Sequence, residues 1–224
     1  MSRIELLASL NKDANSLVDV GCDHGYVAIK AIKEYNAKYA YLLDVNQLPL
    51  ESAKKNVSHE GLLDQTDFLL SDGLIKYEGP TDNLVIAGMG GMLITKILSD
   101  SLFKAKCFKK VILEANNEVD KLRGFLINNH FVFDDEFIIK DGKRVYEIIV
   151  CHYDDSNNAK YSKLDMKFGP ILRRKHPELF MEVISRKKKL LEDCLMKVND
   201  EVGKSKIKIE LSLIQLLLGE INGK

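Results

Sequence analysis

Apolar and polar positions follow a regular rhythm over residues 1–155. Short apolar runs are each followed by a stretch in which apolar residues return every three or four positions, which is typical of buried parallel strands alternating with amphipathic helices. The predicted strands are 17–20, 38–45, 66–70, 83–87 and 110–114. Two longer extended runs, 131–140 and 144–152, are joined by Asp141-Gly142, a strong hairpin signal. The pattern predicts an α/β fold with a mostly parallel sheet closed by an antiparallel hairpin.

The rest of the chain has a helical pattern only. We therefore predict one domain at residues 1–155 and a second, helical domain at 156–224. Gly203 is expected to interrupt the second domain and divide it into two helices. From Ile207 to Ile221 the apolar residues alternate spacings of four and three, the seam of a helix that packs on another helix. We expect a C-terminal α-helical coiled-coil hairpin whose leucines form its core.

Composition narrows the class of protein. Hydrophobic residues make up 46% of the chain and charged residues 29%, as in ordinary globular proteins, and no apolar run is long enough to cross a bilayer. The start of the chain does not have the pattern of a signal peptide. The four cysteines are far apart and include no Cys-x-x-Cys pair, so neither a zinc site nor a disulfide framework is indicated. We predict a cytoplasmic protein with no membrane span and no metal.

The balance of charge conceals a division along the chain. There are 33 basic and 33 acidic residues, but basic residues outnumber acidic ones after Lys160 and the reverse holds before it. A basic appendage on an acidic catalytic body suits an enzyme that binds a polyanion, although a solvated, lysine-rich helix face has the same composition. The residues expected to contact phosphate in this appendage are Arg173, Arg174, Lys187 and Lys188.

Small and acidic residues follow the first three predicted strands. Gly21 and Gly25 have no side chain, so the turn after the first strand lets a ligand approach the backbone at the carboxyl edge of the sheet. Asp44 ends the second strand at the distance expected of an acid that binds ribose hydroxyls, and Asp72 follows the third strand, where a purine amino group could donate. The expected cofactor-binding residues are Gly21, Cys22, Asp23, Gly25, Tyr26, Asp44, Val45, Asp72, Gly73, Ala87 and Gly88.

These acids favour one kind of cofactor. The pyrophosphate fingerprint Gly-x-Gly-x-x-Gly is missing, and Asp23 places an acid where the phosphates of a dinucleotide would lie. S-adenosylmethionine, a sulfonium without phosphate, fits better. The sequence therefore predicts a Rossmann-like class I methyltransferase domain. The alternative from another class is a noncatalytic module that binds S-adenosylmethionine or RNA.

The fourth strand leads into Ala87-Gly-Met-Gly-Gly91, where such enzymes usually hold the target. The chain has neither the Asn/Asp-Pro-Pro-Tyr/Phe motif of exocyclic amino methylation nor a Pro-Cys nucleophile. A glycine-rich loop leaves room for a large planar group. The expected catalytic residues are Asp23 and His24 on the pocket floor, with Met89 and Gly90 in the loop that stacks on the target. Arg3 is a further candidate for contact with phosphate or with the cofactor carboxylate.

Four motifs together resemble one known family, the bacterial tRNA (adenine-22-N1)-methyltransferases, called TrmK. They are Gly21-Cys-Asp-His-Gly-Tyr26, Ala87-Gly-Met-Gly-Gly91, Leu113-Glu-Ala-Asn116 and Asp141-Gly-Lys-x-x-Tyr-Glu147. The helical tail after Gly169-Pro170 is similar as well. The resemblance implies a Rossmann-like methyltransferase with a C-terminal coiled-coil domain and tRNA as the substrate. Arg3 and Asn116 are expected to bind that substrate. We expect a monomer, and the sequence leaves another RNA, a protein or a small molecule open as substrate.

Overall fold

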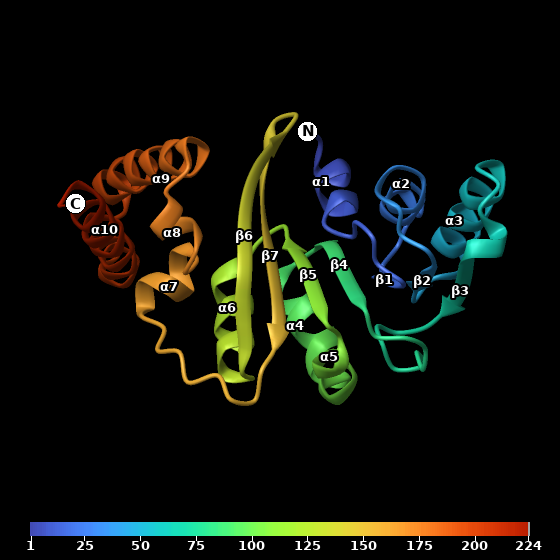
Figure 1. Ribbon diagram of the computed structural model, residues 1–224. Coiled ribbons are helices and arrows are strands. Elements are labelled where there is room, and N and C mark those ends of the chain that lie inside the picture. The colour runs from blue at the N-terminus through green and yellow to red at the C-terminus, as the bar shows by residue number, and fades with distance from the viewer. Residues whose placement is uncertain (224) are drawn as a thin grey trace. The chain divides into compact units, whose positions relative to one another are not determined.

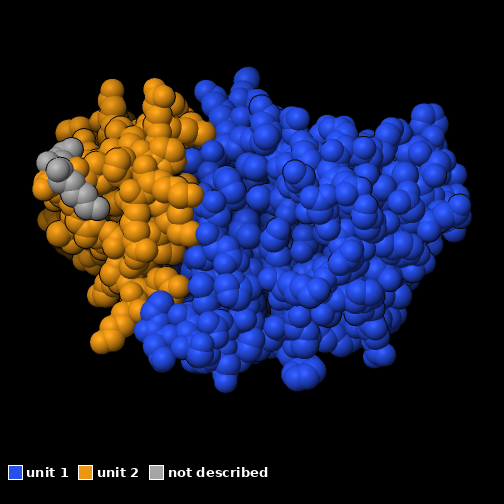
Figure 2. Space-filling model, in the orientation of Figure 1, with its two compact units in different colours: residues 1–159 blue, residues 160–224 orange. Residues whose placement is uncertain are grey.

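The computed structural model describes residues 1–223, which form two compact units that divide after Ala159 (Figure 2). We refer to residues 1–159 as the first unit and to residues 160–224 as the second unit.

The first unit is built on a twisted sheet (Figure 1). Within the described residues the sheet has seven strands in the order β3-β2-β1-β4-β5-β7-β6. The strands are β1 (Leu17–Val20), β2 (Ala40–Asp44), β3 (Thr66–Leu70), β4 (Asn83–Met89), β5 (Lys110–Ala115), β6 (Phe131–Asp141) and β7 (Arg144–Tyr153). The first five are parallel, whereas β7 is antiparallel to both β5 and β6. The predicted mostly parallel sheet closed by an antiparallel hairpin is confirmed.

Helices cover both faces of this sheet, as the apolar strands require. The helices of the first unit are α1 (Arg3–Ser9), α2 (Tyr26–Tyr35), α3 (Gln47–His59), α4 (Gly91–Asp100), α5 (Leu102–Cys107) and α6 (Val119–Asn128), with a 3₁₀ turn η1 (Leu63–Gln65). Helices α1, α2 and α3 share one core with alternate residues of the strands, among them the fully buried Leu17, Leu42 and Val85. Helices α4 and α6 pack together and contact β4 and β6, respectively. Because all parallel strands end at one edge, the turns after β1, β2, β3 and β4 meet there.

The second unit is helical. Its helices are α7 (Lys163–Phe168), α8 (Leu172–Lys175), α9 (Glu178–Lys197) and α10 (Glu201–Asn222). Helices α9 and α10 contact each other, and apolar side chains on both are buried, including Phe180, Ile184 and Ile214. The predicted helical hairpin is therefore present, whereas its coiled-coil packing stays a prediction.

The predicted interruption at Gly203 is wrong. Helix α9 ends at Lys197 and α10 begins at Glu201, so Gly203 lies in the first turn of α10. Asp200 caps this helix, because its Oδ1 accepts a hydrogen bond from the Gly203 N–H at 2.6 Å. A Cβ at position 203 would lie only 2.6 Å from Asp200 Oδ2, so glycine here makes room for the cap.

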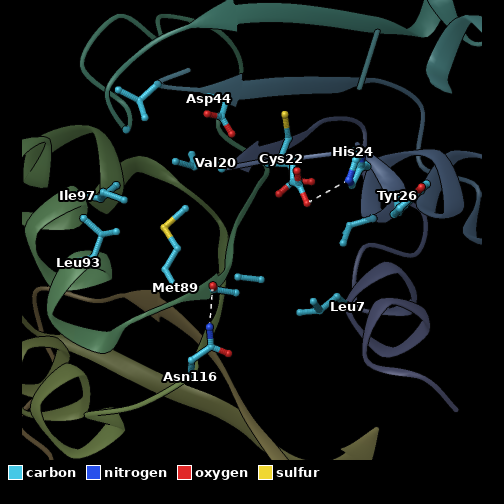
Figure 3. A pocket seen from close by; sticks show the side chains of 18 of the residues that line it. Leu7, Val20, Cys22, His24, Tyr26, Asp44, Met89, Leu93, Ile97 and Asn116 are labelled. Atoms are coloured by element: carbon cyan, nitrogen blue, oxygen red, sulfur yellow. Dashed lines mark hydrogen bonds and ion pairs between the residues drawn. The ribbon is translucent and has the colours of Figure 1, made fainter. Parts of the chain in front are cut away.

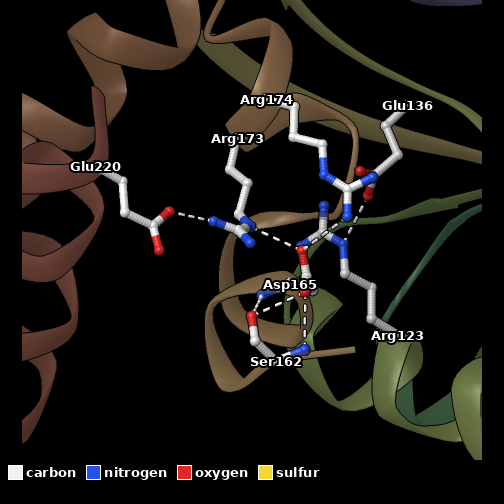
Figure 4. Close-up of polar contacts among 7 residues, drawn as sticks. All are labelled: Arg123, Glu136, Ser162, Asp165, Arg173, Arg174 and Glu220. Atoms are coloured by element: carbon white, nitrogen blue, oxygen red, sulfur yellow. Dashed lines mark hydrogen bonds and ion pairs between the residues drawn. The ribbon is translucent and has the colours of Figure 1, made fainter. Parts of the chain in front are cut away.

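Ion pairs stabilise each unit internally, and Figure 4 shows residues from both. In the first unit the buried Arg123 of α6 donates to Glu136 at 2.8 Å and to Glu147 at 2.6 Å. In the second unit Asp165 accepts from Arg173 Nε at 2.7 Å and closes a capping box with Ser162. The hydrogen bonds from Arg173 and Ser162 outweigh the effect of burial and hold the pKa of Asp165 below its usual value.

Candidate active site

A pocket of about 540 Å³ opens where the parallel strands of the first unit end (Figure 3). The turns after β1, β2 and β3 line it, together with the end of β4, residues of α1, α2 and α4, Asn116 directly after β5, and the start of β7. One part of the lining is acidic and consists of Asp19, Asp23, Asp44 and Asp72, which we call the acidic side. Another part of the lining has no carboxylate and includes two arginines. It consists of Arg3, Asn116, Arg144 and Tyr146, and we call it the hairpin side.

The acidic side owes its position to the sheet. Asp44 is the last residue of β2 and is only 8% exposed; its Oδ1 accepts the Asn46 N–H at 2.9 Å, which fixes the carboxylate at the strand end. Asp72 follows β3 and is exposed to the pocket. The Ser71 N–H donates to the Asp44 carbonyl at 2.9 Å, so the two turns that carry these acids are tied together.

Asp19 is a site residue that the sequence analysis missed. It lies inside β1, is 4% exposed and still lines the pocket. Burial, with a smaller contribution from the charge of Asp44, raises the pKa of Asp19 to about 7, although Arg3 acts in the opposite direction. A charged residue inside an otherwise apolar strand, Leu-Val-Asp-Val, was the signal available in the sequence.

The turn after β1 forms the floor of the pocket. Gly21 has a φ of +74°, and a Cβ there would lie 2.0 Å from the Met89 Cε, so no other residue fits this turn without displacing Met89. His24 is held by α3, because its Nδ1 lies 2.7 Å from Ser52 Oγ and its carbonyl accepts from Asn56 Nδ2 at 3.0 Å. The His24 ring stacks on Tyr26, and its Nε2 lies 3.6 Å from Asp23 Oδ2.

The end of β4 contains a β-bulge. The pairing of β4 with β5 shifts register between Ala87 and Met89, so Gly88 stands out of the ladder with a φ of +79°. The Gly88 N–H donates to Glu114 Oε2 at 2.9 Å, and the Gly88 carbonyl accepts from Asn116 Nδ2 at 2.7 Å. Both polar groups of Gly88 are therefore fixed by the end of β5, and the Met89 side chain extends into the pocket (Figure 3).

The hairpin side is assembled from three distant parts of the chain. Arg3 Nη1 forms a 2.7 Å ion pair with the fully buried Glu114, and its guanidinium lies 5.1 Å from the centre of the Tyr146 ring. The Arg3 N–H donates to Asp141 Oδ2 at 2.9 Å, so α1 is attached to the end of the β6–β7 hairpin. Arg144 and Tyr146 were not predicted as site residues, since only the tertiary fold brings β7 to this edge.

Most of the predicted residues of the first unit meet in this pocket. The lining includes Arg3, Gly21, Cys22, Asp23, His24, Tyr26, Asp44, Val45, Asp72, Gly73, Ala87, Gly88, Met89 and Asn116. Gly25 and Gly90 lie outside the lining: a Cβ on Gly25 would face Leu42 at 3.0 Å, and one on Gly90 would face Asn117 at 3.0 Å. Their direct roles stay predictions, and both glycines permit close packing behind the pocket.

The four basic residues predicted in the second unit differ in their surroundings. Arg173 is ion-paired with both Asp165 and Glu220 and is largely covered. Lys187 lies 3.2 Å from Glu210, and Lys188 lies 3.7 Å from Glu192. Arg174 is the most exposed of the four, with 62% of its side chain accessible and Asp165 at 3.9 Å. Phosphate contacts by these residues stay predictions.

The polar groups that line the pocket suit S-adenosylmethionine. Its acids can accept hydrogen bonds from ribose hydroxyls and ammonium groups, and the Gly21 turn leaves space for close approach of a ligand. Across the described chain no cluster of three or more His, Cys, Asp or Glu side chains could hold a metal ion. No helix in the described part is both long and apolar enough to cross a membrane.

Comparison with known proteins gives a consistent picture. The family profile described as TrmK, tRNA (adenine(22)-N(1))-methyltransferase, matches residues 17–217. The tRNA (adenine(22)-N(1))-methyltransferase of Bacillus subtilis strain 168 is 26% identical over 224 residues, covering 96% of this chain and 94% of the relative.

Two similar solved structures that cover nearly the whole of this chain contain the cofactor or its product. A Streptococcus pneumoniae protein described as a candidate tRNA (m1A22) methyltransferase, in complex with S-adenosyl-L-methionine, has a TM-score of 0.87 and 31% identity, covering 97% of this chain and 100% of that one. M. capricolum TrmK in complex with S-adenosyl-homocysteine has a TM-score of 0.85 and 25% identity, covering 95% of both chains.

Proposed function

The chain belongs to the tRNA (adenine(22)-N(1))-methyltransferase family, TrmK, and on this premise we propose how its own residues carry out the methyl transfer. The enzyme uses S-adenosylmethionine to methylate N1 of an adenine in tRNA. The observation that carries the proposal is the pocket itself, which the acidic side, the hairpin side and the bulge of Gly88 line together.

The acidic side binds the cofactor. Asp44 accepts hydrogen bonds from the ribose hydroxyls, as its position at the end of β2 favours. Asp72 and Gly73 would hold the adenine ring of the cofactor, and Val45 would pack against that ring. Asp19, buried beneath the Gly21 turn, attracts the positively charged ammonium group of the methionine part. Gly21, Cys22, Tyr26, Ala87 and Gly88 shape the remaining wall.

The chemistry needs no strong base. The cofactor supplies a methyl group on a positively charged sulfur. The N1 atom of adenine has a lone pair at neutral pH, so a bond forms between N1 and the methyl carbon while the bond between sulfur and that carbon breaks. The products are a neutral thioether and a positively charged 1-methyladenine, and no proton is removed. The protein must therefore align the base, exclude water and offset the positive charge that appears on the ring.

Residues of the turn after β1 and of the Met89–Gly90 segment align the base and offset its positive charge. Asp23 places a carboxylate near the ring that becomes positive, and His24 is fixed beside it by Ser52. Met89 offers a flexible apolar side chain that packs on the flipped base. Gly90 has no side chain, which allows close packing against Asn117 at the start of α4. Asn116 holds the Gly88 carbonyl, so it positions this loop from β5.

The second unit binds the tRNA. Its helices carry Arg173, Arg174, Lys187 and Lys188, and we expect Arg174 to contribute most because it is the most exposed of the four. The bound tRNA must release its paired or stacked adenine into the pocket, at a cost of a few kcal/mol. We expect the enzyme to act as a cytoplasmic monomer.

The proposal is tested by mapping modified bases. Purified enzyme is incubated with an unmodified tRNA transcript and S-adenosylmethionine labelled in the methyl group, and 1-methyladenine is located by arrest of reverse transcription. We expect arrest at adenine 22 and none in a transcript with guanine at that position. Label at another atom or in another substrate would overturn the assignment.

A further inference from the structure

The end of the β6–β7 hairpin, from Lys140 to Arg144, carries three basic residues close together. Lys140, Lys143 and Arg144 are exposed, whereas Asp141 faces α1 and accepts the Arg3 N–H. Figure 1 shows this hairpin projecting beyond the sheet toward the N-terminus. We refer to residues 140–144 as the hairpin tip.

Arg144 stands apart from the other arginines of the chain. Arg3, Arg123, Arg173, Arg174 and Arg186 each lie within ion-pair distance of a carboxylate. Arg144 lines the pocket, yet in the described part of the chain it has neither an ion pair nor a side-chain hydrogen bond, and the same holds for Lys140 and Lys143. Three basic side chains at one hairpin tip are therefore available to an external anion.

The tip is held firmly where it stands. Two contacts attach the hairpin to α1: Asp141 accepts the Arg3 N–H at 2.9 Å, and the Tyr146 ring lies under the Arg3 guanidinium. Glu114 in turn holds Arg3 at 2.7 Å and the Gly88 N–H at 2.9 Å. The basic tip is thus connected through Arg3 to the same buried carboxylate that holds Gly88, so the distance between the tip and Gly88 is fixed before any ligand binds.

The negative charge of the pocket would repel a phosphate unless nearby basic residues compensate for it. Four carboxylates line the acidic side, and the charge of Arg3 is largely neutralised by Glu114. A phosphate that enters with the target adenine would meet a negative field, which the single positive charge of the cofactor only partly offsets. Arg144 lies at the pocket, where a bidentate contact with that phosphate would compensate, and the two lysines extend the positive field outward.

We propose that the hairpin tip binds the RNA backbone next to the target adenine, with Arg144 contacting the phosphate nearest the pocket and Lys140 and Lys143 contacting its neighbours. This inference rests on the proposed function, because it takes tRNA as the ligand. It adds a second RNA contact, in the first unit, to the one proposed for the helices of the second.

The test compares Arg144→Ala and Arg144→Lys with the control Lys55→Ala, which removes an exposed charge from α3. Affinity for tRNA is measured over a range of salt concentrations, and affinity for S-adenosylmethionine is measured in parallel. For Arg144→Ala we expect the salt slope of tRNA binding to fall by about 0.7 to 0.9 and the affinity for S-adenosylmethionine to stay unchanged. Arg144→Lys should recover most of the slope, and Lys55→Ala should retain all of it.

Two results would overturn the inference. If Arg144→Ala binds tRNA with the same salt slope as Lys55→Ala, the tip does not touch phosphate. If Arg144→Ala loses affinity for S-adenosylmethionine and not for tRNA, Arg144 holds the cofactor carboxylate instead. The proposed function is tested separately by wild-type activity: a wild-type enzyme that binds tRNA without methylating N1 of adenine would contradict that function, and the salt slopes would still decide the role of the tip.

Discussion

The two sides of the pocket differ in how the chain builds them. The acidic side comes from the first three strands and the turns that follow them: Asp19 lies in β1, Asp44 ends β2, and Asp23 and Asp72 lie in the turns after β1 and β3. The hairpin side combines the N-terminus, the end of β5 and the start of β7, which meet only because β7 inserts next to β5. One side is thus a property of local motifs, and the other is a property of the complete fold.

The two sides differ in charge for a related reason. In the proposed function, carboxylates at fixed strand ends hold the small cationic cofactor, whereas a polyanionic substrate needs positive charge that reaches outward. Arg3 stands between the two, since it pairs with Glu114 and also lowers the pKa of Asp19. Variants that change one side and spare the other test this division.

Asp44→Ala should have the largest effect on the acidic side. The variant loses the hydrogen bonds that a carboxylate makes to ribose hydroxyls, worth about 1.5–3 kcal/mol, so affinity for S-adenosylmethionine should fall roughly tenfold or more. Calorimetry would measure this loss, with Asp64→Ala on the exposed turn η1 as a control. An unchanged affinity in Asp44→Ala would remove Asp44 from the cofactor site.

Arg3→Ala should destabilise the junction between the two sides. Glu114 is fully buried, and the variant leaves its carboxylate with one fewer partner, so the free energy of unfolding should fall by about 1–3 kcal/mol. Urea titration would measure the change. The double variant Arg3→Ala with Glu114→Gln should regain part of the loss, because a neutral amide is less costly to bury. If Arg3→Ala and the double variant had the same free energy of unfolding, the charge of Glu114 would not be the cause of the lost stability.

Asp19→Asn should change how the enzyme responds to pH. The pKa of Asp19 rises from 3.8 to about 7 in the folded protein, so between these values the folded state binds more protons than the unfolded state. This group therefore lowers the stability of the free enzyme as pH rises from about 4 to 7. The affinity for a cationic cofactor should increase over the upper part of the same interval, since only ionised Asp19 attracts it.

Binding measurements between pH 5.5 and 8 in buffers with different heats of ionisation would detect this coupling. In the wild type we expect proton release on binding near pH 7, and in Asp19→Asn we expect neither release nor the rise in affinity. Proton release that persists in the variant would assign the coupling to another group.

Neutralising Lys187 and Lys188 together should have the smallest effect. Both lysines already have glutamate partners within the second unit, so each gives up an existing pair to contact phosphate. We expect Lys187→Gln with Lys188→Gln to weaken tRNA binding by only about two- to threefold, and Arg174→Ala to weaken it more. Filter binding at two salt concentrations would rank them, and the reverse order would mean that the lysines are the main contacts.

The sequence was sufficient for most of the framework. Strand β1 and its glycine turn, the acids after β2 and β3, and the hairpin around Asp141-Gly142 follow from periodicity and turn chemistry, which are local. Gly203 was misread because glycine usually breaks a helix, whereas here it accommodates the Asp200 cap. Asp19 was visible in the sequence as a carboxylate inside an apolar strand but was given no role, and Arg144 was missed because only the sheet order brings it to the pocket.

The surroundings of Cys22 have a consequence for chemical labelling. Its thiol lines the pocket but is 7% exposed, and burial together with the charges of Asp19 and Asp44 raises its pKa well above the usual value. The thiolate is the reactive form, so an electrophile designed for this pocket finds a poor nucleophile there. The exposed Cys107 on α5 is the more accessible target. A cysteine-directed reagent would therefore modify Cys107 on the outer surface first and leave Cys22 in the pocket unmodified.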